Sequence, residues 1–144
     1  MRLWFTSLLL LILTFVLAAC GNDNTGEEDN SAAAVEAIEN YWNARAELDE
    51  ESLFQYSCAA RESVVPGEIQ SLMSVENLRL EGVDCRQTGT QGDDIIVTCD
   101  GMLVADYGAG DVNEFPLRSY LMTEENGEWK MCGEVTDPQT EEAG

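Results

Sequence analysis

Cysteine is the residue type in this chain whose number and spacing say most about chemistry. One of the five cysteines, Cys20, stands apart at the end of a hydrophobic leader, and the other four are Cys58, Cys85, Cys99 and Cys132. In an exported domain an even set of this kind predicts two disulfides, although four cysteines allow three connectivities. Zinc ligands usually come in close pairs such as C-x-x-C. Because no such pair occurs, we expect no metal site.

The positions of the four cysteines favour one pairing. A turn near Gln91 places Cys85 almost opposite Cys99, where cross-strand neighbours come within bonding range. A Cys85–Cys99 bond would close a loop of about 15 residues, which contributes about 3 kcal/mol in the chain-entropy model. Cys58 would then pair with Cys132 and join the second predicted helix to the last predicted strand.

The leader has the pattern of an export signal. Met1-Arg2 is a short positive start, and Leu3 to Ala19 is an uncharged, mostly apolar run. The run ends in LAACG, and the whole segment resembles a bacterial lipoprotein signal peptide, whose lipobox is a Leu, two small residues and Cys. The resemblance implies a diacylglycerol on the Cys20 thiol and cleavage before Cys20. An uncleaved membrane anchor and an ordinary secreted protein are the alternatives.

Such a lipid would hold the protein on the extracytoplasmic face of a membrane in the bacterial cell envelope. Two or three acyl chains, palmitate among them, give stable anchoring, whereas one chain gives only marginal binding. We therefore expect a removed signal peptide at residues 1–19, a lipidated flexible tether at 20–30, one domain at 31–135 and a polar disordered tail at 136–144. The tether sequence GNDNTGEEDN lacks apolar residues able to join a core.

Helical periodicity dominates the first half of the predicted domain. Asn30-Ser31 is expected to cap a helix that carries Val35, Ile38, Trp42 and Arg45 on one stripe. Asp49 is expected to cap a shorter helix that includes Cys58. The Pro-Gly pair at 66–67 should break the chain, and residues 68–74 could form a third short helix.

The second half changes to the alternating pattern of strands. We expect strands near residues 78–83, 95–104, 115–122 and 128–132, with Gly82 marking a bulge. Asn126-Gly127 is the strongest of the hairpin signals between them. Helices followed by an antiparallel meander predict an α+β domain, with N-terminal helices packed on a curved sheet of four or more strands.

This order of elements, ending on NGEWKMCG, resembles the NTF2-like superfamily, a cystatin-like α+β cone. Its small lipoprotein members of the DUF4878 and SnoaL-like groups are the most similar, over about residues 32–135. The resemblance implies a sheet that curls around the long helix and leaves a conical pocket. It also implies that a homodimer formed face to face through the sheets would be in keeping with the family.

Aromatic side chains are the candidates for the pocket lining, because Tyr and Trp combine an apolar body with a hydrogen-bonding tip. Plain core packing is the alternative for each of them. The first candidates are Tyr41, Trp42, Tyr120 and Trp129, and the wider aromatic set adds Tyr56, Tyr107 and Phe115.

The charge balance excludes several function classes. The chain has 28 acidic and 7 basic residues, a net charge of −21, and a surface this negative repels nucleic acid. The absence of histidine removes the usual general base and the commonest metal ligand. We predict no catalytic residue and no cofactor. Asp84, Asp100 and Asp106 lie in or beside predicted strands and are the alternative candidates for a carboxylate base.

A calcium loop is a further alternative. Residues 106–114 place several oxygen ligands on a Gly-rich turn but lack the spacing of an EF-hand loop, and a simple hairpin turn explains the same residues.

The leading functional hypothesis is a non-enzymatic lipoprotein whose domain binds a small apolar ligand or a basic protein of the envelope. One alternative is a carboxylate-dependent isomerase, cyclase or hydratase of SnoaL-like type. Another is a purely structural accessory domain of the envelope.

Overall fold

The computed structural model describes residues 25–136. The predicted signal peptide, the lipid on Cys20 and the tail from residue 137 lie outside the described residues. No helix between residues 25 and 136 is long and apolar enough to cross a membrane.

Three helices precede all the strands. They are α1 (Thr25–Glu47), α2 (Glu50–Tyr56) and α3 (Val65–Leu72). The predicted cap of α2 is present, because the carboxylate of Asp49 accepts a hydrogen bond from the Ser52 amide at 3.2 Å. Cys58, which we expected inside this helix, follows its end.

Two helix boundaries differ from the sequence-based expectation. α1 begins at Thr25 rather than after Asn30, inside the predicted tether. The sequence of this first turn contains two acidic residues, at 27 and 28, and acidic residues are favourable there. The Pro66-Gly67 pair lies within the first turn of α3 instead of breaking the chain, because the missing amide of a proline costs little at that place.

Five strands form one antiparallel sheet, in agreement with the expected four or more. They are β1 (Asn77–Gln91), β2 (Asp94–Asp106), β3 (Val112–Pro116), β4 (Ser119–Glu125) and β5 (Glu128–Glu134). The order is β1-β2-β4-β5. β3 and β4 pair with the same edge of β2, β3 with residues 102–106 and β4 with residues 95–98. The predicted third strand is divided after Pro116, whose nitrogen cannot donate to a ladder.

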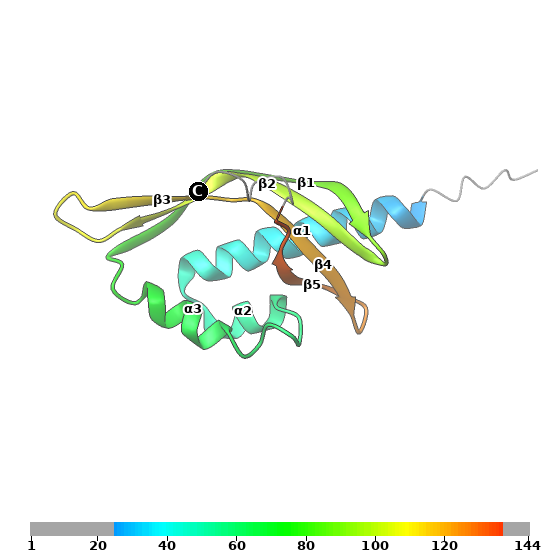
Figure 1. Ribbon diagram of the computed structural model, residues 1–144, viewed down its shortest axis with the longest axis horizontal. Coiled ribbons are helices and arrows are strands. Elements are labelled where there is room, and N and C mark those ends of the chain that lie inside the picture. The colour runs from blue at the N-terminus through cyan, green and yellow to red at the C-terminus, as the bar shows by residue number, and fades with distance from the viewer. Residues whose placement is uncertain (1–24, 137–144) are drawn as a thin grey trace, which may run out of the picture.

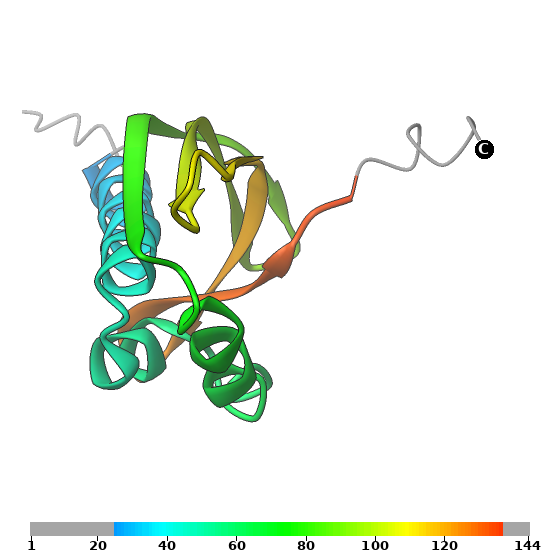
Figure 2. The ribbon, with the colours of Figure 1, turned by 90° about the vertical axis from the view of Figure 1, so that its left-hand side faces the viewer.

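The sheet bends sharply where β1 and β2 pass each other at two glycines. The register shifts between Glu81 and Asp84, as the predicted bulge at Gly82 requires. Opposite it, Gly101 has φ +109°, and a Cβ atom there would lie 2.8 Å from the backbone of Glu81 and Gly82. Only glycine fits this close approach. The sheet consequently curls, and α1 lies along its concave side (Figure 2).

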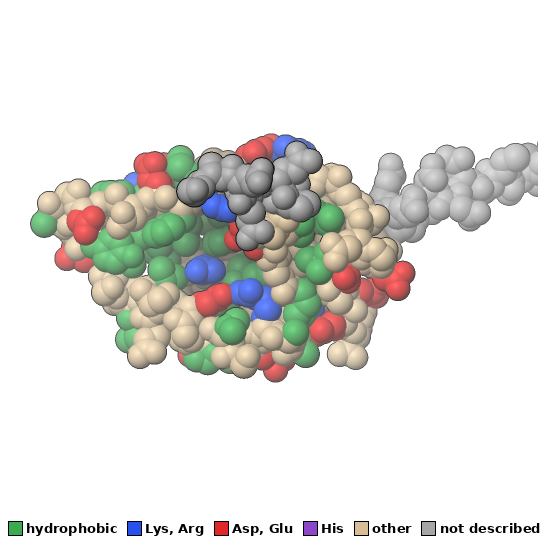
Figure 3. All heavy atoms as spheres, in the orientation of Figure 1, with side chains coloured by type: hydrophobic (Ala, Val, Ile, Leu, Met, Phe, Trp, Pro, Cys, Tyr) green, Lys and Arg blue, Asp and Glu red, His purple; other side chains and the backbone are tan. Residues whose placement is uncertain are grey.

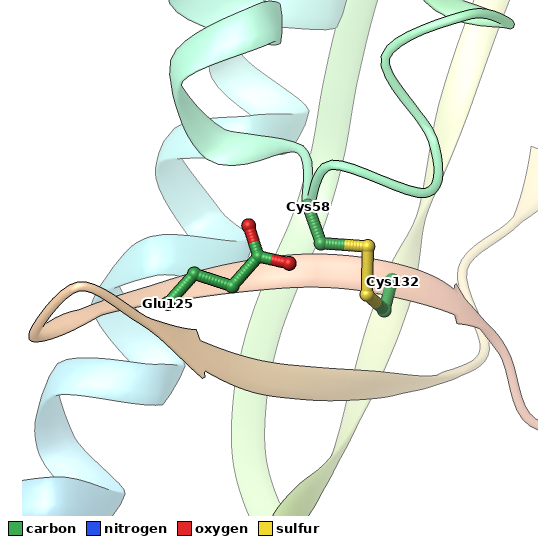
Figure 4. A group of neighbouring side chains, drawn as sticks. All are labelled: Cys58, Glu125 and Cys132. Atoms are coloured by element: carbon green, nitrogen blue, oxygen red, sulfur yellow. A yellow bond between two sulfur atoms is a disulfide. The ribbon is translucent and has the colours of Figure 1, made fainter.

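Both predicted disulfide pairs are present. Cys85 and Cys99 are opposite each other on β1 and β2, with their Cα atoms 4.0 Å apart. Cys58, just after α2, is bonded to Cys132 in β5, with a Cα separation of 5.2 Å (Figure 4). The amide of Cys58 also donates to the carbonyl of Met131 at 3.0 Å. These contacts hold the α2–α3 segment against the last strand.

The core is the contact between α1 and the concave face of the sheet. Ala34, Ile38 and Tyr41 on α1 are fully buried, and Val97 and Met122 on the sheet are buried in the same cluster. In Figure 1, α2 and α3 lie on the side of α1 away from β1 and β2.

Candidate ligand pocket

A cavity of about 450 Å³ occupies the open end of the cone. Its wall is built by α1, by the chain from α2 into α3, by the β3–β4 connection and by β5. Figure 3 shows a hollow between the sheet and the lower helices, in which basic and acidic side chains gather. The lining residues are Tyr41, Trp42, Arg45, Arg61, Glu68, Phe115, Pro116, Arg118, Tyr120, Met131 and Glu134.

Three of the four predicted aromatic candidates line this cavity. Trp42 contacts Tyr41 edge to face, with ring centroids 5.6 Å apart, and Tyr120 in a tilted arrangement at 5.5 Å. These are favourable aromatic geometries and fix one side of the pocket. Trp129 borders other hollows instead. It lies on β5 two residues before Met131, and is therefore displaced by about 7 Å towards the β4–β5 turn.

The two tyrosine hydroxyls remain protonated near neutral pH. Burial raises the pKa of Tyr120 to about 12. Burial, followed by the nearby carboxylate of Glu68, also raises the pKa of Tyr41. The Tyr120 oxygen accepts a hydrogen bond from the Arg118 amide at 3.0 Å, which ties β4 to the chain at the pocket mouth.

An ion cluster around Glu68 forms the helical wall. Its carboxylate accepts a hydrogen bond from the Tyr41 hydroxyl at 2.9 Å and another from the Arg61 guanidinium. Arg45 lies 3.5 Å from the same carboxylate and stacks over the Trp42 ring, 5.2 Å from its centroid. The three charged side chains are only 20–23% exposed. The cluster is therefore partly shielded from water and carries one more positive than negative charge.

A second ion pair lies at the mouth. Arg118 Nη1 is 3.2 Å from Glu134 Oε1, and both side chains are well exposed, at 65% and 43%. Such a pair contributes little to stability, so its members can exchange partners at low cost. Of the seven Lys and Arg residues in the chain, three line this one cavity.

Comparison with solved structures identifies the fold. No protein-family model matches the sequence, and no curated protein matches it. Among solved structures, a proposed dehydratase of the NTF2-like family from Streptomyces avermitilis matches with a TM-score of 0.56 and 15% identity, over 73% of this chain and 92% of that one. The domain has an NTF2-like fold.

Two further solved structures are similar. RPA3114 from Rhodopseudomonas palustris, a protein containing a SEC-C motif, matches with a TM-score of 0.51 and 16% identity over 80% of this chain and 88% of that one. A protein with a cystatin-like fold from Caulobacter vibrioides matches with a TM-score of 0.49 and 16% identity, over 76% of this chain and 92% of that one.

The aspartates that we considered as candidate bases do not line the pocket of the NTF2-like domain. Asp84 and Asp100 are exposed, and Asp100 is paired with Arg86 at 2.6 Å. Asp106 is half-buried and accepts a hydrogen bond from the Gly108 amide at 2.9 Å. That bond belongs to a hairpin turn, so the calcium loop has the local contacts of a simple turn. The carboxylates in the pocket wall are those of Glu68 and Glu134.

One group of side chains has the proximity of metal ligands. Cys58, Cys132 and Glu125 bring their ligand atoms within 4.8 Å of one another (Figure 4). The two sulfur atoms are bonded to each other and so offer no thiolate. Glu125 accepts hydrogen bonds from the Ala59 amide at 3.1 and 3.3 Å. The group therefore fastens the α2–α3 segment to the sheet.

A larger hollow of about 600 Å³ lies at the other end of α1. Its lining combines the buried side chains of Ile95 and Trp129 with mostly exposed polar residues, and Asp93 is the charged residue among them. The pocket at the open end of the cone combines buried aromatic rings with a partly buried cluster in which Glu68 contacts Arg45 and Arg61. It is the candidate site for that reason.

Proposed function

We propose that this protein is a bacterial lipoprotein, held through Cys20 on the extracytoplasmic face of a membrane, whose NTF2-like domain binds a small ligand without catalysing a reaction. The observation that supports binding is the 450 Å³ cavity with its ordered aromatic and ionic wall. A volume of this size suits a small molecule. The LAAC lipobox and the cysteines in disulfides support export and anchoring.

The anchor can be tested by the mass of the amino-terminal peptide. The full chain, expressed in a bacterium with lipoprotein processing, should begin at Cys20 and carry a diacylglycerol on that thiol. Cys20→Ser should lose both the lipid and the cleavage, because the modified thiol is the signal for processing in such precursors. An unmodified Cys20 in the wild-type protein would rule out the lipoprotein assignment.

Ligand binding can be tested with a chemically mixed fragment library on the full chain in detergent. At about ten times its dissociation constant, a bound fragment adds about 1.4 kcal/mol of stability and raises the melting temperature by several degrees. Phe115→Ser should weaken fragments that bind in the pocket, because this half-exposed ring lines it. Met73→Ser, at an exposed position outside the pocket, is the matched control. If no fragment binds, or if every fragment binds Phe115→Ser as tightly as the wild-type protein, the ligand hypothesis is wrong.

A carboxylate-dependent reaction is the second candidate function, favoured by one observation. Glu68 is a carboxylate inside the pocket wall, as such an isomerase, cyclase or hydratase requires. Its two oxygens, however, already accept hydrogen bonds from Tyr41 and Arg61 and face Arg45. A carboxylate held in this way orients arginines more readily than it removes a proton. We therefore place binding ahead of catalysis.

A further inference from the structure

The wall of the pocket has more hydrogen-bond donors than acceptors. Three buried nitrogen atoms in it find no acceptor among residues 25–136: Nε of Arg45, Nε of Arg61 and Nε1 of Trp42. Each of these N–H groups can only donate, since neither guanidinium nor indole nitrogen accepts a hydrogen bond. A buried donor without a partner is destabilising, because it has lost its hydrogen bonds to water. Molecules that bring acceptor oxygens would relieve this cost.

The charges of the wall point the same way. Three guanidinium groups face two carboxylates, so the lining carries one positive charge in excess within a chain of net charge −21. Arg45 and Arg61 are held by Glu68, while Arg118 is paired with Glu134 at the exposed mouth. The excess charge belongs to partly buried arginines, whose planar forks match the geometry of oxyanions.

We propose that the pocket binds a small organic monoanion of the carboxylate class with an aromatic body. This inference rests on the proposed function and names the ligand class of the same site. A carboxylate supplies acceptors in a planar pair and a single negative charge, which matches the excess of the wall. The half-exposed ring of Phe115, together with the accessible edges of the buried rings of Trp42 and Tyr120, provides the apolar surface for the rest of the ligand.

Binding requires the arginine side chains to turn. The unpartnered Nε atoms have almost no accessible surface, so a ligand can reach them only after Arg45 or Arg61 changes its rotamer. The exposed Arg118 can leave Glu134 and close over the carboxylate at the mouth. The acidic outer surface does not forbid this, because exposed charges are largely screened beyond about 8 Å at physiological ionic strength.

The test is calorimetric titration of the full chain in detergent with a matched series of aromatic probes. Phenylacetate, the neutral phenylacetamide and the dianionic phenyl phosphate differ mainly in the head group. Phenylacetate is expected to bind about tenfold more tightly than phenylacetamide, since the charge-assisted hydrogen bonds are absent from the amide. Added salt should weaken phenylacetate and leave the amide nearly unchanged.

Arginine variants locate the effect. Arg61→Gln should reduce phenylacetate affinity about tenfold and the amide little. Arg118→Gln, at a well-exposed position that folding does not need, should reduce it by a smaller factor, which keeps the test valid if Arg61→Gln is unstable. Arg86→Gln is the matched control, because Arg86 is exposed and paired with Asp100 away from the pocket.

Three outcomes would overturn the inference. Equal binding of phenylacetate and phenylacetamide in the pocket would leave the ligand-binding function standing and remove the carboxylate class. Tighter binding of phenyl phosphate than of phenylacetate would replace it with a phosphate ester. The protein could also bind none of the three probes and yet bind a neutral or cationic fragment at Phe115. That result would refute the anionic ligand class and leave the binding function standing.

Discussion

Replacing Cys58 and Cys132 together with alanine is expected to lower the free energy of unfolding by about 4 kcal/mol, against about 3 kcal/mol for Cys85 and Cys99. The reason is the length of chain that each bond closes. The sequence separation is 74 residues for the first pair and 14 for the second. Closing a loop removes entropy from the unfolded chain, and this loss grows only with the logarithm of the loop length. The longer loop therefore has a larger effect, but not one in proportion to its length.

The two double variants are well matched for measurement. Cys58, Cys85 and Cys99 are buried and Cys132 is half-buried, so both variants remove mostly buried sulfur, and urea unfolding of the two proteins compares mainly the constraint. A loss of 4 kcal/mol is a large fraction of the 5–15 kcal/mol typical of a domain. Equal losses from the two pairs, or a larger one from Cys85 and Cys99, would show that native-state contacts rather than loop closure decide the stability.

Local signals in the sequence predicted much of the fold. The Asn126-Gly127 turn has φ values of +57° and +83°, as a two-residue hairpin turn of this type requires. The Asp49 cap likewise depends on residues three positions apart. The cross-strand pair of Cys85 and Cys99 follows from counting outward from one turn. In each case the determining residues are neighbours in the chain, so no knowledge of the tertiary structure is needed.

The pocket could be predicted only in part, because two of its three arginines come from irregular chain. Arg61 lies between α2 and α3, and Arg118 lies between β3 and β4, where neither helical nor strand periodicity indicates a direction. Arg45 was visible, since it occupies the apolar stripe of α1 one turn after Trp42. A charged residue on a buried stripe is the signal that could have identified the ionic wall.

Composition misleads about the pocket for a related reason. The net charge of −21 describes the solvated exterior, where acidic side chains such as Asp84 and Asp100 are exposed. The chain has only seven basic residues, and three of them line one cavity. The local charge of the cavity therefore differs in sign from the net charge of the chain. A ligand inside the cavity responds to these close charges more strongly than to distant screened ones.

Tyr41 connects the core to the ionic wall, and its replacement should separate their contributions. Tyr41→Ala is expected to lower the free energy of unfolding by about 3–5 kcal/mol, as for other large buried aromatic side chains. Tyr41→Phe keeps the ring against Trp42 and removes the hydroxyl that bonds to Glu68 and receives a hydrogen bond from Arg61. We expect it to cost about 1.5–3 kcal/mol, the range for hydrogen bonds to charged groups.

Chemical unfolding of both variants measures these losses, with Tyr107→Phe as the control on a half-buried ring outside the pocket. The control should change stability by no more than about 0.5 kcal/mol. If Tyr41→Phe is as stable as the wild-type protein, the hydroxyl contributes nothing net and Glu68 is held by its arginines alone. If it instead costs as much as Tyr41→Ala, the ionic wall and not the aromatic packing holds α1 to α3, because the two variants differ by the ring itself.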